Sequence, residues 1–157
     1  MPASPPTEPG PTSPEEFGLA FHHLGLAVRT PGRAQAFLRA LGYRSGAPVL
    51  DPEQNVHLIW AEHPRMPAVE LVYPTDTPGP VTELLARQGE SIYHACFEAE
   101  DVAAALARMK AAGHRAVCVR EERPAILFGG RLVSFHFVAG FGLIELLATA
   151  PPRGEAG

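Results

Sequence analysis

The fold is decided by the stretch "FHHLGLAV", residues 21–28, a short apolar segment that holds a histidine, His23. A second segment of the same kind, "IYHACFEAE", covers residues 92–100 and holds His94. When these two segments are aligned, the later run "AFLRALGYR" falls on "ARMKAAGHR". Order and spacing that recur in this way predict two copies of one structural unit.

Each copy has the pattern of a strand, a helix and then further strands. Apolar residues at helical spacing predict a first helix over residues 30–42, with Thr30 as N-cap and Gly42 as its left-handed end. In the second copy, Asp101 is expected to cap a helix that Gly113 ends. The strands that follow are "NVHLIWAE" and "AVELVYP" in the first copy and "RAVCVR", "RLVSFHFV" and "GLIELLA" in the second, and the helix "GPVTELLARQG" joins the copies.

Alternation along the first strand separates its two histidines. Side chains of successive strand residues point to opposite faces, so His23 lies opposite Leu24, Leu26 and Val28. The aliphatic face is the one expected to pack against the helix. We therefore expect His23 to point into the space that the sheet encloses, and the neighbouring His22 to point away from it.

Three more polar side chains stand at mid-strand among apolar residues: Glu70, His94 and Glu145. A buried carboxylate without a partner costs several kcal/mol, so it normally takes up a proton or finds a partner. Taken singly, each residue also fits a hydrogen-bonded histidine or a carboxylate at a sheet edge. Taken together, one His and one Glu from each copy predict a divalent cation held by His23, Glu70, His94 and Glu145. Two imidazoles and two carboxylates suit Zn, Mn, Co, Ni or Fe(II).

Composition excludes several classes of function. The chain has 157 residues, with 46% hydrophobic and 19% charged residues, which is typical of a globular protein. Its net charge is −4 and its 13 Lys and Arg residues form no run, which argues against a nucleic-acid partner. No apolar run approaches the ~20 residues of a membrane span, and the N-terminus lacks the apolar core of a secretory signal. With only two cysteines, Cys96 and Cys118, the sequence favours a cytoplasmic protein without a membrane partner.

Proline-rich and glycine-rich ends frame one expected domain. Residues 1–16 are predicted to be a disordered leader and residues 150–157 a flexible tail. Residues 17–149 are predicted to form a single domain, with modules at about 20–75 and 90–149.

The sequence resembles the vicinal oxygen chelate superfamily, which includes glyoxalases and bleomycin resistance proteins, and within it the methylmalonyl-CoA epimerase family. The matching segments are "HHLGLAV", "PEQNV", "VELVYP", "GESIYHACFEAEDV", "FGGRLVSF" and "GLIELL". The resemblance implies an α+β fold in which two βαβββ modules form a cupped eight-stranded mixed sheet with helices on the outside. It implies the same four metal ligands as the strand pattern, and it implies a homodimer.

The resemblance also implies a function: a metal-dependent isomerase or epimerase that removes a proton alpha to the carbonyl of an acyl thioester or related small acid. Glu145 and Glu53 are the candidate catalytic bases. The substrate-binding candidates are Gln54, Tyr93, Cys96, Arg123 and Arg131.

Two other functions stay open on the sequence. A glyoxalase-type lyase uses the same His/Glu/His/Glu set, and relatives of this fold bind antibiotics in the cup without a metal. A dioxygenase with two His and one Glu on Fe(II) is disfavoured, because a fourth ligand is present.

Overall fold

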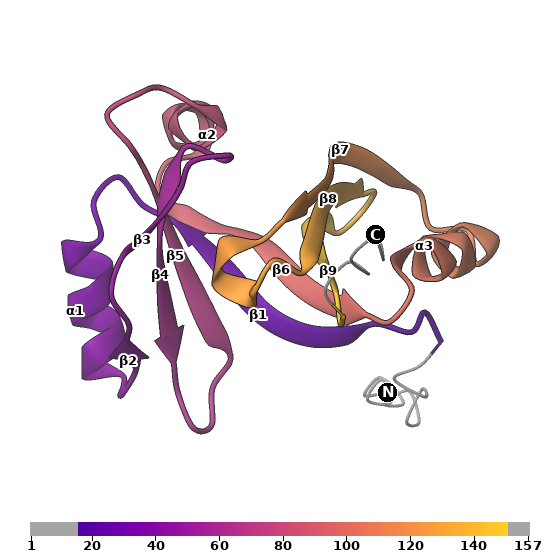
Figure 1. Ribbon diagram of the computed structural model, residues 1–157, viewed down its shortest axis with the longest axis horizontal. Coiled ribbons are helices and arrows are strands. Elements are labelled where there is room, and N and C mark those ends of the chain that lie inside the picture. Colours follow the sequence, from indigo (N-terminus) through magenta and orange to yellow (C-terminus); the bar gives the residue numbers. More distant parts are fainter. Residues whose placement is uncertain (1–15, 151–157) are drawn as a thin grey trace, which may run out of the picture.

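The computed structural model describes residues 16–150 and shows a mixed sheet with helices on its outside (Figure 1). The predicted leader and tail lie almost entirely outside the described residues. The strands are β1 (Ala20–Ala27), β2 (Arg44–Ser45), β3 (Val49–Asp51), β4 (Val56–Glu62), β5 (Ala68–Pro74), β6 (Ser91–Ala99), β7 (Ala116–Pro124), β8 (Leu132–Val138) and β9 (Gly142–Ala148). The helices are α1 (Gly32–Ala40), α2 (Pro80–Gln88) and α3 (Val102–Ala111), with a 3-10 turn η1 (Ile126–Phe128).

The sheet is built from two halves that meet at β1 and β6. The strand order is β2-β4-β5-β1-β6-β9-β8-β7, and β3 pairs with β4 beside β2. β1 runs parallel to β5 and β6 runs parallel to β9, while β1 and β6 are antiparallel. The two halves therefore repeat the same pairing, which confirms the expected α+β fold of two similar modules.

The strand count differs from the expected eight. The edge of the first half is made by two short strands, β2 and β3, which pair with different parts of β4. Gly46, Ala47 and Pro48 separate them, and a proline cannot donate a ladder hydrogen bond. β7 is also longer than "RAVCVR" and continues to Pro124.

Each helix of a module covers the sheet face opposite to the predicted ligands. Leu38 of α1 packs with Ile59 and Leu71 in one buried cluster. Met109 of α3 packs with Leu146 in another. Because Glu70 and Glu145 directly precede Leu71 and Leu146 in their strands, alternation turns these carboxylates away from the helices.

Two details of α1 differ from expectation. The helix begins after Pro31, which caps it without a side-chain hydrogen bond, so Thr30 is not the N-cap. Phe37 and Leu41 are 66% and 45% exposed, and only Leu38 is buried, because α1 touches the sheet through a narrower stripe than its apolar spacing suggests. Both predicted C-terminal glycines, Gly42 and Gly113, do have positive φ, at 99° and 87°.

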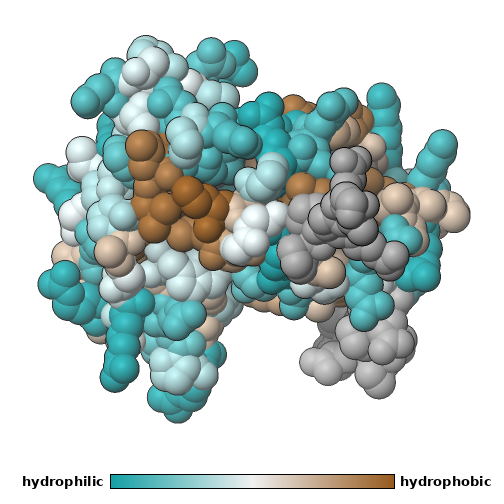
Figure 2. Space-filling view, in the orientation of Figure 1, coloured by the Kyte–Doolittle hydropathy of each residue, from teal (hydrophilic) through white to brown (hydrophobic). Residues whose placement is uncertain are grey.

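The face of the molecule seen in Figure 2 carries an apolar patch where β3 and η1 lie. Leu50 of β3 and Ile126 of η1 are about half exposed. In the part of the chain that the structure describes, no helix is long and apolar enough to cross a membrane.

Candidate metal centre

The four predicted ligands, His23, Glu70, His94 and Glu145, are all at most 5% exposed and come together in the space between the halves of the sheet. The Nε2 atom of His23 lies 3.4 Å from Nε2 of His94 and 3.5 Å from Oε1 of Glu145. The same nitrogen lies 4.0 Å from Oε2 of Glu70. His23, Glu70 and His94 each offer a ligand atom within 4.8 Å of the other two, and Glu145 adjoins this group through His23.

Strand register explains this convergence. Gly25 of β1 is paired with Glu70 on one side and with His94 on the other. Cys96 of β6 is likewise paired with His23 and with Glu145. Each ligand thus sits on a strand next to the strand of its neighbour, on the same face of the sheet.

The donor set fits a divalent cation. Ligand atoms bound at about 2.0–2.2 Å to one tetrahedral ion lie about 3.3–3.6 Å from one another. The separations around His23 are close to that range. Among residues 16–150, two buried polar atoms have no hydrogen-bond partner: Nδ1 of His94 and Oε1 of Glu145. A cation bound at this site would supply the missing partner of the Glu145 oxygen. These residues can therefore hold a metal ion.

The electrostatics of the centre suit a cation too. Burial lowers the pKa of His23 to about 2, and His94 and His22 add to the effect. Burial also lowers the pKa of His94 to about 3. Burial raises the pKa of Glu145 to about 7, and burial together with Glu145 and Asp51 raises the pKa of Glu70 well above its usual value. With these pKa values the imidazoles are neutral near pH 7, as metal ligands must be, and the carboxyls would have to give up their protons to a cation.

A cavity of about 430 Å³ opens beside the centre. Tyr93 and Phe135 line it, and their rings lie 4.5 Å and 5.3 Å from the ring of His94. Its polar lining consists of Gln54, Arg120 and Arg123, and its apolar lining includes Val81 and Leu84 of α2. A largely apolar cavity with a few convergent polar groups is the usual form of a small-molecule site.

Two aromatic rings cover the centre on another side. The rings of Trp60 and Phe128 lie 5.1 Å and 5.4 Å from the ring of His23. Phe128 belongs to η1, which reaches from the second module toward the first, and its placement was not anticipated from the sequence.

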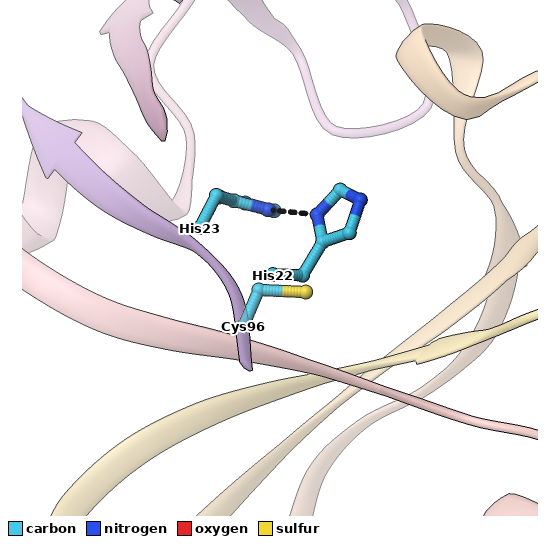
Figure 3. Close-up of side chains that lie close together, drawn as sticks. All are labelled: His22, His23 and Cys96. Atoms are coloured by element: carbon cyan, nitrogen blue, oxygen red, sulfur yellow. Dashed lines mark hydrogen bonds between the residues drawn. The ribbon is translucent and has the colours of Figure 1, made fainter. Parts of the chain in front are cut away.

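His22 was expected on the far face, and the structure corrects this. Phe21 pairs with Phe97 and His23 pairs with Cys96, so His22 is an extra residue in β1. Such a bulge breaks the alternation of side chains. Nδ1 of His22 lies 2.8 Å from Nδ1 of His23, and Cys96 lies beside the two rings (Figure 3).

The family follows from a direct comparison. A family model described as the glyoxalase/bleomycin resistance protein/dioxygenase superfamily matches residues 22–135. The chain belongs to this superfamily.

Several proteins similar to this chain are epimerases. The chain is 33% identical over 129 residues to the ethylmalonyl-CoA/methylmalonyl-CoA epimerase of Cereibacter sphaeroides, which covers 80% of this chain and 94% of that protein. The crystal structure of methylmalonyl-CoA epimerase from Mycobacterium tuberculosis matches with a TM-score of 0.65 at 23% identity, over 83% of this chain and 88% of that one. A hypothetical protein from Bacillus halodurans matches with a TM-score of 0.71 at 20% identity, over 84% and 95% of the two chains. A Streptomyces coelicolor methylmalonyl-CoA epimerase variant in complex with 2-nitronate-propionyl-CoA matches with a TM-score of 0.62 at 25% identity, over 83% and 94%.

The predicted substrate residues of this superfamily member divide into two groups. Gln54, Tyr93 and Arg123 line the cavity, and the fully buried Cys96 lies in the wall of the metal centre. Arg131 instead donates to the Glu98 carboxylate at 2.7 Å and to a backbone carbonyl.

Two further residues, Glu53 and Arg120, need comment. Glu53 is exposed, and its carbonyl oxygen accepts hydrogen bonds from Arg120 and Arg123 at 3.3 Å and 3.5 Å. Sequence reasoning missed Arg120, which ends the apolar run "RAVCV", because only the tertiary structure brings β7 across to the turn that holds Glu53 and Gln54.

Proposed function

We propose that this protein is a metal-dependent epimerase that removes and returns the proton alpha to the carbonyl of an acyl thioester, as its methylmalonyl-CoA epimerase relatives suggest. The observation that carries the proposal is the convergence of His23, Glu70, His94 and Glu145 next to a cavity with cationic groups. Both sequence likeness and the donor set support it.

His23, Glu70, His94 and Glu145 would hold the cation. A divalent cation bound there would act as a Lewis acid toward the thioester carbonyl, which makes the neighbouring C–H more acidic. Its identity is proposed only as Co, Mn, Zn, Ni or Fe, because imidazole and carboxylate ligands suit each of them.

Glu145 is the proposed base. Its Oε1 atom has no hydrogen-bond partner among the described residues, and burial raises its pKa to about 7. To act as the base, the Glu145 carboxylate would leave the cation, take the proton from carbon and return it to either face. Glu53 stays a second candidate, although the structure places it on an exposed turn.

The cavity would orient the substrate. Arg120 and Arg123 supply positive charge for a carboxylate or phosphate, and Gln54 supplies a further polar group. Trp60 and Phe128 cover His23 with apolar rings and so limit the access of water from their side.

The test is deuterium exchange into methylmalonyl-CoA in D₂O, followed by proton NMR of the methyl signal. With metal-loaded protein, we expect the alpha proton to be lost far faster than in buffer alone, and expect chelated protein to lose this activity. Exchange at the buffer rate with every one of the five metals would overturn the proposal. Turnover of the hemithioacetal of methylglyoxal and glutathione in the same preparations would instead assign a glyoxalase-type lyase.

The matched variants E145Q and E53Q identify the base. Because Gln keeps the size of Glu but cannot accept a proton, E145Q should lower the exchange rate about 10²-fold to 10⁴-fold. The E53Q variant should exchange at nearly the wild-type rate. Metal content is measured in both variants, because loss of metal from E145Q would mimic loss of the base. If E53Q exchanged slowly and E145Q at nearly the wild-type rate, the catalytic base would be Glu53.

A further inference from the structure

His22 lies beside the metal centre without being one of its four ligands. Its Nδ1 atom is 2.8 Å from Nδ1 of His23 (Figure 3). The other nitrogen of His23, Nε2, faces His94 at 3.4 Å and Glu145 at 3.5 Å. The two nitrogens of the His23 ring thus have separate partners, and only one of them faces the ligand atoms.

The bulge in β1 holds His22 in this place. The pairing passes from Phe21 to His23 with no partner for His22, which turns the side chain to the ligand face. The His22 ring then packs against Trp60 and Phe128, with centroids 5.8 Å and 5.2 Å away. Its position is therefore defined by the backbone and by two aromatic neighbours.

A neutral imidazole carries its proton on one nitrogen only. A cation at the centre needs the lone pair of His23 Nε2, so the proton of that ring has to stand on Nδ1. At 2.8 Å, the acceptor for this N–H is Nδ1 of His22. We propose that His22 is a positioning residue of the metal centre, which accepts the Nδ1–H of His23 and so keeps the Nε2 lone pair aimed at the ligand site.

The second module offers a comparison within the molecule. The residue before His94 is Tyr93, and the pairing skips it as well, because Gly25 pairs with His94 and Leu26 with Ile92. The Tyr93 ring meets the ring of His94 edge-on at 4.5 Å, and Nδ1 of His94 has no partner among residues 16–150. The chain therefore orients one of its two ligand histidines by a hydrogen bond and the other by packing.

Cys96 offers a competing arrangement. Its sulfur and one nitrogen each of His22 and His23 lie within 4.8 Å of one another. A cation bound by these three residues would need His22 as a ligand and not as a hydrogen-bond acceptor. The two arrangements differ in their dependence on Cys96, which makes C96S a decisive variant.

The test uses metal affinity and the tautomer of His23, so it does not depend on turnover or on the identity of the substrate. H22F keeps an aromatic ring against Trp60 and Phe128 but removes the acceptor. H22N places its side-chain oxygen near the position of Nδ1 and keeps the acceptor. Zinc dissociation constants are measured by chelator competition for wild type, H22F, H22N and C96S, and the metal-free proteins are examined by long-range ¹H–¹⁵N NMR of histidine-labelled samples.

We expect H22F to raise the zinc dissociation constant about 10-fold to 100-fold and to lose the Nδ1–H form of His23. We expect H22N and C96S to stay near the wild-type constant. The proposal is overturned if metal-free wild type shows His23 protonated on Nε2, a measurement that requires no variant to fold. It is also overturned if H22N loses as much zinc affinity as H22F. A loss of the same size in C96S would overturn it too, and would assign the cation to His22, His23 and Cys96.

Discussion

Gly25 is the residue whose lack of a side chain leaves room for His94 in the candidate metal centre. It lies in β1 between Glu70 and His94, and a methyl group built on it would overlap the imidazole ring of His94. Glycine is needed at this position for space and not for backbone freedom, because the φ angle of Gly25 is not positive. The "HLGL" motif therefore has a glycine because the ligand histidine of the other module occupies that volume.

The variant G25A tests this explanation. The added methyl group should displace His94 and raise the dissociation constant for zinc at least 10-fold, as measured by chelator competition. G32A is the matched control, since a Cβ on Gly32 at the start of α1 meets no atom within 4 Å. Equal metal affinity in G25A and G32A would contradict the assigned role of Gly25.

At the scale of the elements, the corresponding helices of the two modules end alike and begin differently. Tyr43 donates its backbone N–H to Leu38, and His114 donates likewise to Met109, so both helices close with the same hydrogen bond. At the start, the Asp101 side chain accepts a hydrogen bond from the Ala104 N–H at 2.9 Å, whereas α1 has no side-chain cap. The repeat is therefore closer at the C-terminal ends of the helices than at their N-terminal ends.

This difference predicts unequal effects of two alanine substitutions. D101A removes the cap of α3 and should lower the free energy of unfolding by about 1 kcal/mol. T30A should leave that free energy almost unchanged, because Thr30 caps nothing in α1. Urea unfolding followed by circular dichroism compares the two variants, and a larger loss in T30A than in D101A would show that α1 is capped by Thr30 after all.

At the scale of the whole molecule, the candidate metal centre takes its residues from both halves of the sheet. His23 and Glu70 come from the first half, and His94 and Glu145 come from the second. A cation that binds the folded protein and not the unfolded chain stabilises the fold, by about 2.7 kcal/mol at a free concentration 100 times its dissociation constant. Metal loading should therefore raise the melting temperature.

The homodimer and the cytoplasmic setting stay predictions.

The gain in melting temperature should depend on pH. Burial raises the folded-state pKa of Glu145 to about 7 and also raises the pKa of Glu70. The metal-free folded state therefore binds these protons more tightly than the unfolded chain does. It is most stable at low pH and loses this contribution as the pH rises through about 7. A cation must displace these protons at pH 5 but fewer of them at pH 8. The imidazoles are already neutral in the folded state at both values.

Calorimetry with and without zinc should consequently show a larger metal-induced increase in Tm at pH 8 than at pH 5. The H94A variant, which lacks one ligand, is the control and should show a small increase at both values. An equal increase at pH 5 and pH 8 in the wild type would mean that the carboxyls are not protonated in the metal-free centre.

The sequence by itself determined the two modules and the strands that bring His23, Glu70, His94 and Glu145 together as buried polar residues. Alternation along β5, β6 and β9 separates polar from apolar faces, and a buried carboxylate needs a partner, so Glu70, His94 and Glu145 stood out from their own strands. This reasoning is local: it needs only the residues of one strand and the cost of burial.

Only the tertiary structure decided the surroundings of the ligands. His22 and Tyr93 turn toward the centre because the register between β1 and β6 skips each of them, and register is a property of two paired strands. Phe128 and Arg120 reach the site from β7 and the segment after it, across a distance that no local pattern encodes. Side-chain alternation is set within a strand, whereas bulges and contacts between modules depend on how the strands pair. For this reason the buried polar residues of the site could be predicted and their neighbours could not.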